Sequence, residues 1–219
     1  LQANGKSIEA CMRSLINKVN VNDARFAKLI GDVQQGIADY YTRQMPKILA
    51  KVNSLVAREE YEDAMAALAV RYFDNDSRVV DACCGTGQLT RALILEGVHP
   101  SAILGFDTDA ELVDLYARFY SEAAALRMQF REIDFRCENV VANPPFETTE
   151  VVDFLSWLAK VQQPGDRSVL LLPHGFIDKQ RPKGIQETLR QFKVLYRTPM
   201  QERFARTNVI AEIVVLERR

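Results

Sequence analysis

The sequence predicts an α/β fold with a seven-stranded, mostly parallel sheet that follows an α-helical N-terminal region. Three observations lead to this prediction. After residue 74, short apolar runs alternate with amphipathic helical stretches, which is typical of a parallel sheet covered by helices. A glycine turn directly follows the first of these runs. Residues 1–74 have helical periodicity and no convincing strand.

The elements follow in order from these patterns. The apolar runs expected to form strands are residues 79–83, 102–106, 128–133, 139–142, 168–172, 192–196 and 210–216. Between them, helical spacing predicts helices over residues 88–96, 110–126, 150–161 and 184–191. A turn-rich cluster, Asp74-Asn75-Asp76-Ser77, separates the two patterns. We therefore expect a helical region over residues 1–74 and an α/β domain over residues 75–219.

Composition limits the class of protein. A chain of 219 residues with 47% hydrophobic content can bury one core of ordinary size. The chain has no apolar run of about 20 residues and begins without a secretory signal pattern, so we expect a cytoplasmic protein with no membrane partner. Its four cysteines have neither C-x-x-C spacing nor nearby histidines, which argues against a metal site and a disulfide framework.

Charge is distributed unevenly along the chain. The net charge is −1, but basic residues outnumber acidic ones after residue 175. This basic segment fits either an ordinary solvated surface or a patch that contacts phosphate groups. The sequence leaves both interpretations open.

Open α/β sheets bind ligands at the carboxyl ends of their strands, and polar residues follow several predicted strands here. The first strand leads into a glycine turn that ends Gly85-Thr86-Gly87, which allows close approach of a ligand. A dinucleotide-binding fingerprint would require a third glycine where this chain has Thr90. Asp107 ends the second strand, where a carboxylate accepts hydrogen bonds from ribose hydroxyls. Asp134 and Phe135 end the third and offer an acceptor and an apolar wall for an adenine.

The fourth predicted strand ends in Asn143-Pro144-Pro145-Phe146. Two prolines stop the strand and hold the next residues extended. The amide of Asn143, the carbonyl of Pro144 and the ring of Phe146 suit a flat substrate that carries an NH₂ group.

Together these segments resemble the S-adenosylmethionine-dependent amino-methyltransferases. The resemblance is nearest to adenine-N6 DNA methyltransferases whose cofactor motif precedes the catalytic motif, including modification subunits of type I restriction systems. Upstream, Tyr40-Tyr41-Thr42 resembles the family's aromatic-aromatic-Thr-Pro segment, although Arg43 replaces the proline. The resemblance implies the Rossmann-like fold of the class I methyltransferases and S-adenosylmethionine as cofactor. It also implies two sets of site residues. The catalytic set is Asn143, Pro144, Pro145 and Phe146, and the cofactor-binding set is Asp81, Cys84, Gly85, Gly87, Asp107, Thr108, Asp134, Phe135 and Thr42.

The implied reaction is methyl transfer to adenine N6 in DNA, with Asn143 and Pro144 accepting the amino hydrogens and Phe146 stacking on the base. The chain has no room for a large recognition domain, so recognition is expected from a partner or specificity subunit, unless the substrate is small or the chain is part of a longer protein. Release-factor glutamine and RNA base methyltransferases use a similar N-P-P-aromatic segment and remain alternatives. A further alternative is an inactive cofactor-binding subunit.

Overall fold

The computed structural model describes Gln35 and residues 61–74, 77–178, 183–203 and 210–219. By its contacts, the chain forms a compact unit over residues 50–219.

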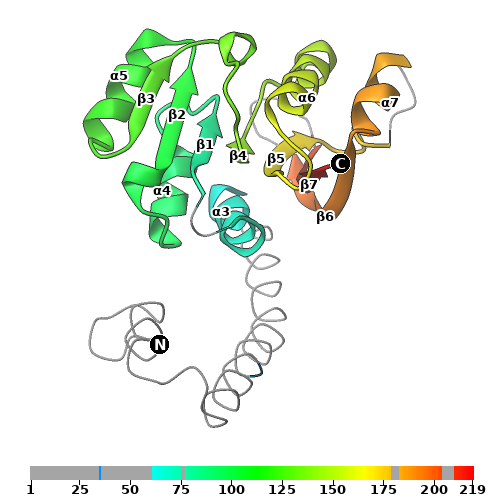
Figure 1. Cartoon of the computed structure of the whole chain (residues 1–219), viewed down its shortest axis with the longest axis horizontal. Helices are drawn as coiled ribbons and strands as arrows, with labels where there is room; N and C mark the ends of the chain where they lie inside the picture. Colours follow the sequence, from blue (N-terminus) through cyan, green and yellow to red (C-terminus); the bar gives the residue numbers. More distant parts are fainter. Residues whose placement is uncertain (1–34, 36–60, 75–76, 179–182, 204–209) are drawn as a thin grey trace, which may run out of the picture. The chain divides into compact units, whose positions relative to one another are not determined.

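Seven strands form one sheet in the order β3-β2-β1-β4-β5-β7-β6 (Figure 1). Neighbouring strands from β3 to β5 are parallel, and β7 runs antiparallel to both β5 and β6. The predicted seven-stranded, mostly parallel sheet is confirmed. The strands are β1 (Val79–Ala82), β2 (Ile103–Asp107), β3 (Ala124–Arg127), β4 (Asn139–Ala142), β5 (Arg167–Pro173), β6 (Phe192–Arg203) and β7 (Ile210–Arg218).

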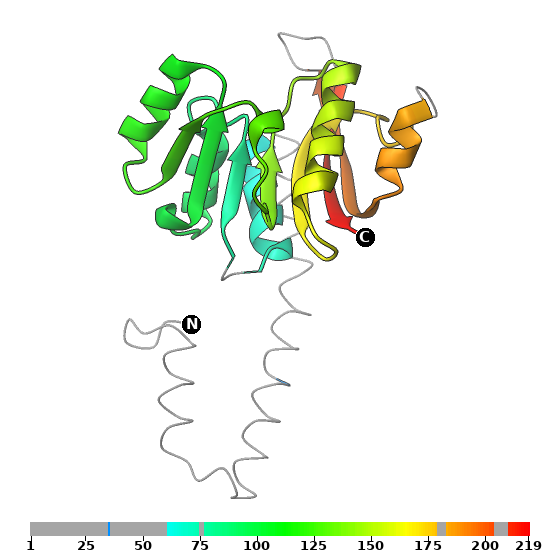
Figure 2. The same ribbon diagram turned by 45° about the horizontal axis from the view of Figure 1, so that its top comes forward.

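Helices cover both faces of the sheet. On one face of the sheet α6 packs with α7 and with the short 3₁₀ helix η2, and on the other face α3 packs with α4. Figures 1 and 2 show α6 and α7 on one face and α3 and α4 on the other. The helices are α3 (Tyr61–Tyr72), α4 (Gln88–Leu95), α5 (Ala110–Phe119), α6 (Thr148–Val161) and α7 (Lys183–Leu189), with 3₁₀ helices η1 (Pro100–Ala102) and η2 (Phe130–Glu132). Within the described residues, no helix is both long and apolar enough to span a bilayer.

The helix α3 packs on the sheet domain. Its Ala64, Leu68 and Ala69 side chains are fully buried, and it contacts α4, β5 and β7. The sequence placed this segment in the N-terminal region that ends at residue 74, whereas the contacts divide the chain between residues 49 and 50. Because small alanine side chains let a helix approach closely, α3 forms part of the layer that covers the sheet.

The largest part of the core lies between α6 and the sheet. Apolar residues at helical spacing, including Val151, Phe154 and Leu158, give α6 a buried face. Trp157 is also buried, and its indole N–H donates a hydrogen bond to the carbonyl of Ile133 at 3.1 Å. That bond fastens the chain between η2 and β4 to the helix.

The third strand differs from the sequence prediction. It covers Ala124–Arg127 and not residues 128–133, and the preceding helix ends at Phe119 and not at residue 126. The strand residues Ala-Ala-Leu-Arg all favour helices as isolated residues. Pairing with β2, in which Arg127 lies opposite Asp107, overrides that local preference. The apolar segment after the strand instead forms η2 and buries Phe130.

Candidate active site

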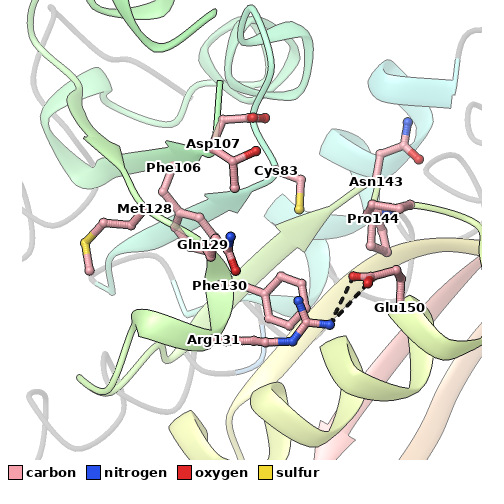
Figure 3. A pocket seen from close by; sticks show the side chains of 12 residues that line it. Cys83, Phe106, Asp107, Met128, Gln129, Phe130, Arg131, Asn143, Pro144 and Glu150 are labelled. Carbon is pink, nitrogen blue, oxygen red and sulfur yellow. Dashed lines mark hydrogen bonds and ion pairs between the residues drawn. The ribbon is translucent and has the colours of Figure 1, made fainter. Parts of the chain in front are cut away.

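Two adjoining cavities open at the carboxyl ends of the parallel strands. The larger has a volume of about 520 Å³ and the smaller about 190 Å³. Cys83 and Asn143 line both cavities, so these two residues mark their junction. Figure 3 shows the larger cavity, with Cys83 between Asp107 and Asn143. Its lining is Cys83, Phe106, Asp107, Thr108, Met128, Gln129, Phe130, Arg131, Asn143, Pro144, Pro145 and Glu150.

The smaller cavity lies between α3 and the glycine turn. Its lining is Tyr61, Glu62, Met65, Cys83, Cys84, Gly85, Thr86, Gln88, Leu89, Asn143 and Leu171. Two predicted cofactor residues, Cys84 and Gly85, are among them.

Alternating left-handed residues shape the glycine turn. Cys83, Gly85 and Gly87 have φ values of 59°, 53° and 86°. Cys83 is the only non-glycine residue with positive φ in the described part of the chain, and such a conformation is disfavoured for a residue with a Cβ. The turn is held to β2 by the Cys84 N–H, which donates to the Phe106 carbonyl at 3.0 Å. The backbone at the cavity junction is therefore strained and fixed in place.

Gly87 does not line either cavity but supports the turn from beneath. A Cβ at Gly87 would lie 2.3 Å from Cε2 of Tyr120 and 2.9 Å from Cδ2 of Tyr116. Gly105 on β2 also lies against the ring of Tyr116, since a Cβ added at Gly105 would lie 2.6 Å from Cζ of that ring. Tyr116 is fully buried. The two glycines are needed because Tyr116 of α5 packs directly against β2 and the turn, and Tyr120, which follows the helix, packs against the turn.

Asp81 is buried below the turn and does not line either cavity. Its Oδ2 accepts hydrogen bonds from the Thr90 backbone N–H at 3.1 Å and the Thr90 hydroxyl at 2.7 Å. Its Oδ1 has no partner among the described residues. Burial raises the pKa of Asp81 to about 7, although the Thr90 hydrogen bonds act in the opposite direction. Thr90, which occupies the place of a third glycine, therefore fixes this acid.

Asp107 lines the larger cavity together with Thr108. Its Oδ2 accepts a hydrogen bond from the Gly85 N–H at 2.9 Å, and its Oδ1 accepts one from the Asp109 N–H at 3.1 Å. The carboxylate thus joins the end of β2 to the glycine turn while it faces the cavity. Asp109 in turn caps α5, because its Oδ1 accepts from the Glu111 and Leu112 N–H groups.

The Asn143-Pro144-Pro145-Phe146 segment follows β4, which lies between β1 and β5 in the sheet. Asn143 is exposed and lines both cavities, whereas Pro144 is buried and Pro145 is exposed in the wall of the larger one. Phe146 is half-buried and is not among the residues that line them. The strand order thus brings the amide of Asn143 opposite Asp107 and beside the glycine turn.

Asp134 and Phe135 lie outside both cavities. Both side chains are exposed, and Phe135 is 41% accessible. Because β3 ends at Arg127, the residues that reach the larger cavity after this strand are Met128, Gln129, Phe130 and Arg131. The expectation for Asp134 and Phe135 followed from the wrong strand position. Thr42, the remaining predicted cofactor residue, lies outside the described residues.

An ion-pair network closes one wall of the larger cavity. Arg131 donates to both carboxylate oxygens of Glu150 at 3.2 and 3.3 Å and to Asp153 at 2.6 Å (Figure 3 shows the Arg131–Glu150 contacts). Its guanidinium also lies 4.6 Å from the ring centroid of Phe130. The contacts join the chain after β3 to the start of α6. These residues could not be identified from the sequence, because only the fold brings the two segments together.

The cysteines at the junction are not suited to nucleophilic catalysis. Burial, assisted by the nearby Asp107 carboxylate, raises the pKa of Cys83 to about 12, and burial likewise raises the pKa of Cys84. Both thiols are therefore protonated at neutral pH and unreactive. In the described part of the chain, no three His, Cys, Asp or Glu side chains are grouped to hold a metal ion.

Internal contacts use several charges of the basic C-terminal segment. Arg197 pairs with Asp178 and with the buried Glu212, each at 2.8 Å. Arg218 donates to the carbonyls of Ala159 and Gln191. Part of the basic segment therefore serves contacts within the fold, a role that neither interpretation from the sequence included.

No protein-family model matches the chain, and no curated protein matches it. In solved structures it is similar to magnesium protoporphyrin IX methyltransferase from Synechocystis with bound S-adenosylmethionine (16% identity, 84% of this chain and 96% of that one, TM-score 0.58). It is also similar to TrmN from Thermus thermophilus, with 21% identity and a TM-score of 0.53. This match covers 72% of the present chain and 49% of TrmN, so the chain spans about half of that protein. A third similar structure is the ribosomal protein L11 methylase from Lactobacillus delbrueckii (15% identity, 71% of this chain and 78% of that one, TM-score 0.53). The fold is that of the class I S-adenosylmethionine-dependent methyltransferases.

Proposed function

We propose that this chain binds S-adenosylmethionine and transfers its methyl group to an exocyclic amino group, with adenine N6 in DNA as the substrate. One observation supports this proposal above the others. Asn143, the residue suited to hold an amino group, lies at the junction of the two cavities. A donor that occupies both cavities would have the middle of its length beside this side chain.

The residues present fit this cofactor. The larger cavity offers the Asp107 carboxylate for a ribose, together with Phe106 and Phe130 as apolar walls for an adenine. The smaller cavity is lined by residues of the glycine turn, where Gly85 leaves open space at its Cβ position. The larger cavity alone falls in the volume range of about 300–1,000 Å³ typical of ligand sites.

The bound cofactor would supply a methyl group on a positively charged sulfur, which is already activated for transfer. Asn143 would then orient the substrate. Its side-chain oxygen accepts one hydrogen of the amino group and the Pro144 carbonyl accepts the other, which turns the nitrogen lone pair toward the methyl group. Transfer would form the N–C bond while the S–C bond breaks with its electron pair kept by sulfur, and the substrate nitrogen would lose one proton to water. These residues contribute orientation and hydrogen bonding, and no strong base is needed.

The choice of adenine in DNA rests on the resemblance of the N-P-P-F segment to DNA adenine methyltransferases. Phe146 would stack on an extruded base and offset part of the cost of unstacking, about a few kcal/mol. A glutamine amide or an RNA base carries the same NH₂ chemistry on a flat group. The test therefore includes these substrates.

The test combines a substrate screen with one matched pair of variants. The protein is incubated with methyl-labelled S-adenosylmethionine and, separately, with DNA, RNA and a release factor, and the modified atom is identified by mass spectrometry. We expect label on adenine N6 of DNA. Asn143→Ala should lower the turnover rate by about 100-fold or more, while the dissociation constant of the cofactor changes by less than about threefold.

Asp134→Asn provides the control, because Asp134 is exposed and lies outside both cavities. We expect it to leave turnover and cofactor affinity unchanged. Label on a glutamine or on RNA alone would overturn the choice of substrate. Loss of cofactor binding in Asn143→Ala would show that Asn143 is structural and would contradict the mechanism.

A further inference from the structure

Among the described residues, a single charged one lines the smaller cavity. Of the described residues that line this cavity, only Glu62 carries a formal charge, since the two cysteine thiols are protonated. Glu62 is half-buried in the first described turn of α3. The described residues give it no ion-pair partner. A carboxylate that lines a cavity, with no cation paired to it among the described residues, favours a positively charged ligand group.

The position of Glu62 indicates which of the two cationic groups of the proposed cofactor it can reach. The sulfonium has to lie near the junction of the cavities, which is marked by Cys83 and Asn143. Glu62 and its neighbours on α3, Tyr61 and Met65, line the smaller cavity only. The cation that reaches this part of the cavity is the α-ammonium group of the methionine end.

We infer that Glu62 binds the α-ammonium group of S-adenosylmethionine and so determines recognition of the amino-acid end of the cofactor. The inference rests on the proposed function. It assigns α3 a part in the site, although the sequence pattern placed this helix in a separate region. Because the two cavities meet at the junction, an ammonium group held by Glu62 would also limit how far the donor can slide past Asn143.

The test measures binding of three ligands to the wild-type protein and to Glu62→Gln by calorimetry. S-adenosylmethionine has both cationic groups, S-adenosylhomocysteine keeps the ammonium but has a neutral sulfur, and 5′-methylthioadenosine has neither. We expect Glu62→Gln to lower the affinity for the first two ligands equally, by about threefold to tenfold. Binding of 5′-methylthioadenosine should not change. Asp63→Asn removes a neighbouring charge on α3 that does not line the cavity, and we expect it to change none of the three.

Each other outcome has a distinct meaning. If only the affinity for S-adenosylmethionine falls, Glu62 binds the sulfonium and the assignment is wrong. If the affinity for all three ligands falls equally, Glu62 maintains the shape of the cavity. If no affinity changes, Glu62 does not contact the ligand. Either result overturns the inference. If the wild-type protein binds none of the three, the proposed function itself fails. Equal melting temperatures of wild type and Glu62→Gln verify that the variant is folded.

Discussion

Two walls of the candidate site are held together in different ways. The turn wall, residues 81–90, rests on fully buried groups, because Asp81, Thr90 and the supporting ring of Tyr116 are inaccessible to solvent. The loop wall comprises residues 128–131 and Glu150, and its ion pair is partly exposed, with side-chain accessibilities of 43% for Arg131 and 34% for Glu150. Buried packing fixes the backbone of the first wall, whereas solvent-screened charges position side chains of the second. Changes in the turn wall should therefore alter stability, and changes in the loop wall should alter ligand affinity.

The largest expected effect tests the packing of the turn wall. Gly87→Ala places a Cβ 2.3 Å from Tyr120 and 2.9 Å from the buried Tyr116 at positive φ, so we expect a loss of about 2–4 kcal/mol in the free energy of unfolding. Gly85→Ala also has positive φ but meets nothing within 4 Å, and it should cost only about 1 kcal/mol. Chemical denaturation measures both. Equal losses would show that the tyrosines do not restrain the turn.

The second prediction concerns the buried acid of the turn wall. The folded-state pKa of Asp81 is raised from 3.8 to about 7, so the folded protein binds more protons than the unfolded chain between these values. The stability associated with Asp81 is fully present below pH 3.8 and is lost as the pH rises to about 7. We expect the free energy of unfolding of the wild type, minus that of Asp81→Asn, to fall by up to about 4 kcal/mol across this window. A difference that stays constant with pH would contradict the raised pKa.

The smallest expected effect on stability tests the loop wall. Arg131→Ala removes the contacts to Glu150, Asp153 and the Phe130 ring. We expect almost no change in the free energy of unfolding, because the pairs are exposed. The affinity for S-adenosylmethionine should fall by about threefold to tenfold, since Glu150 is left unpaired in the cavity wall.

The matched control for the loop wall is Arg118→Ala, which removes an exposed arginine on α5 that does not line the cavity. Calorimetric titration and thermal unfolding together separate the two effects. A large loss of stability in Arg131→Ala with unchanged affinity would reverse the assignment of the two walls.

The turn wall was predictable because its residues are close in sequence. A short apolar strand, an acid, glycines with positive φ and a helix follow one another within residues 79–95, and each has a local physical preference. Asp107 was predictable for a similar reason, since it ends an apolar run. Local patterns could not reveal that Thr90 holds Asp81 or that Tyr116 requires Gly87, because those contacts depend on packing between elements.

The loop wall was missed because its strand has a sequence that favours a helix. Ala124 to Arg127 become β3 only because β2 provides a partner for their backbone groups. Because β3 ends earlier than the sequence predicted, Gln129 and Phe130 line the cavity in place of the predicted Asp134 and Phe135. A few residues of error at an edge strand are therefore enough to misplace one side of a ligand site.

By itself, the sequence determined the α/β fold, the glycine turn and the Asn143-Pro144-Pro145-Phe146 segment, because alternating apolar runs, positive φ and consecutive prolines are local properties of the chain. Only the tertiary structure decided that Asn143 lines both cavities, that Glu62 faces the smaller one and that Arg131 meets Glu150. These relations depend on strand order and on helix packing across the sheet. They join residues far apart in the chain, and no short sequence pattern encodes such contacts.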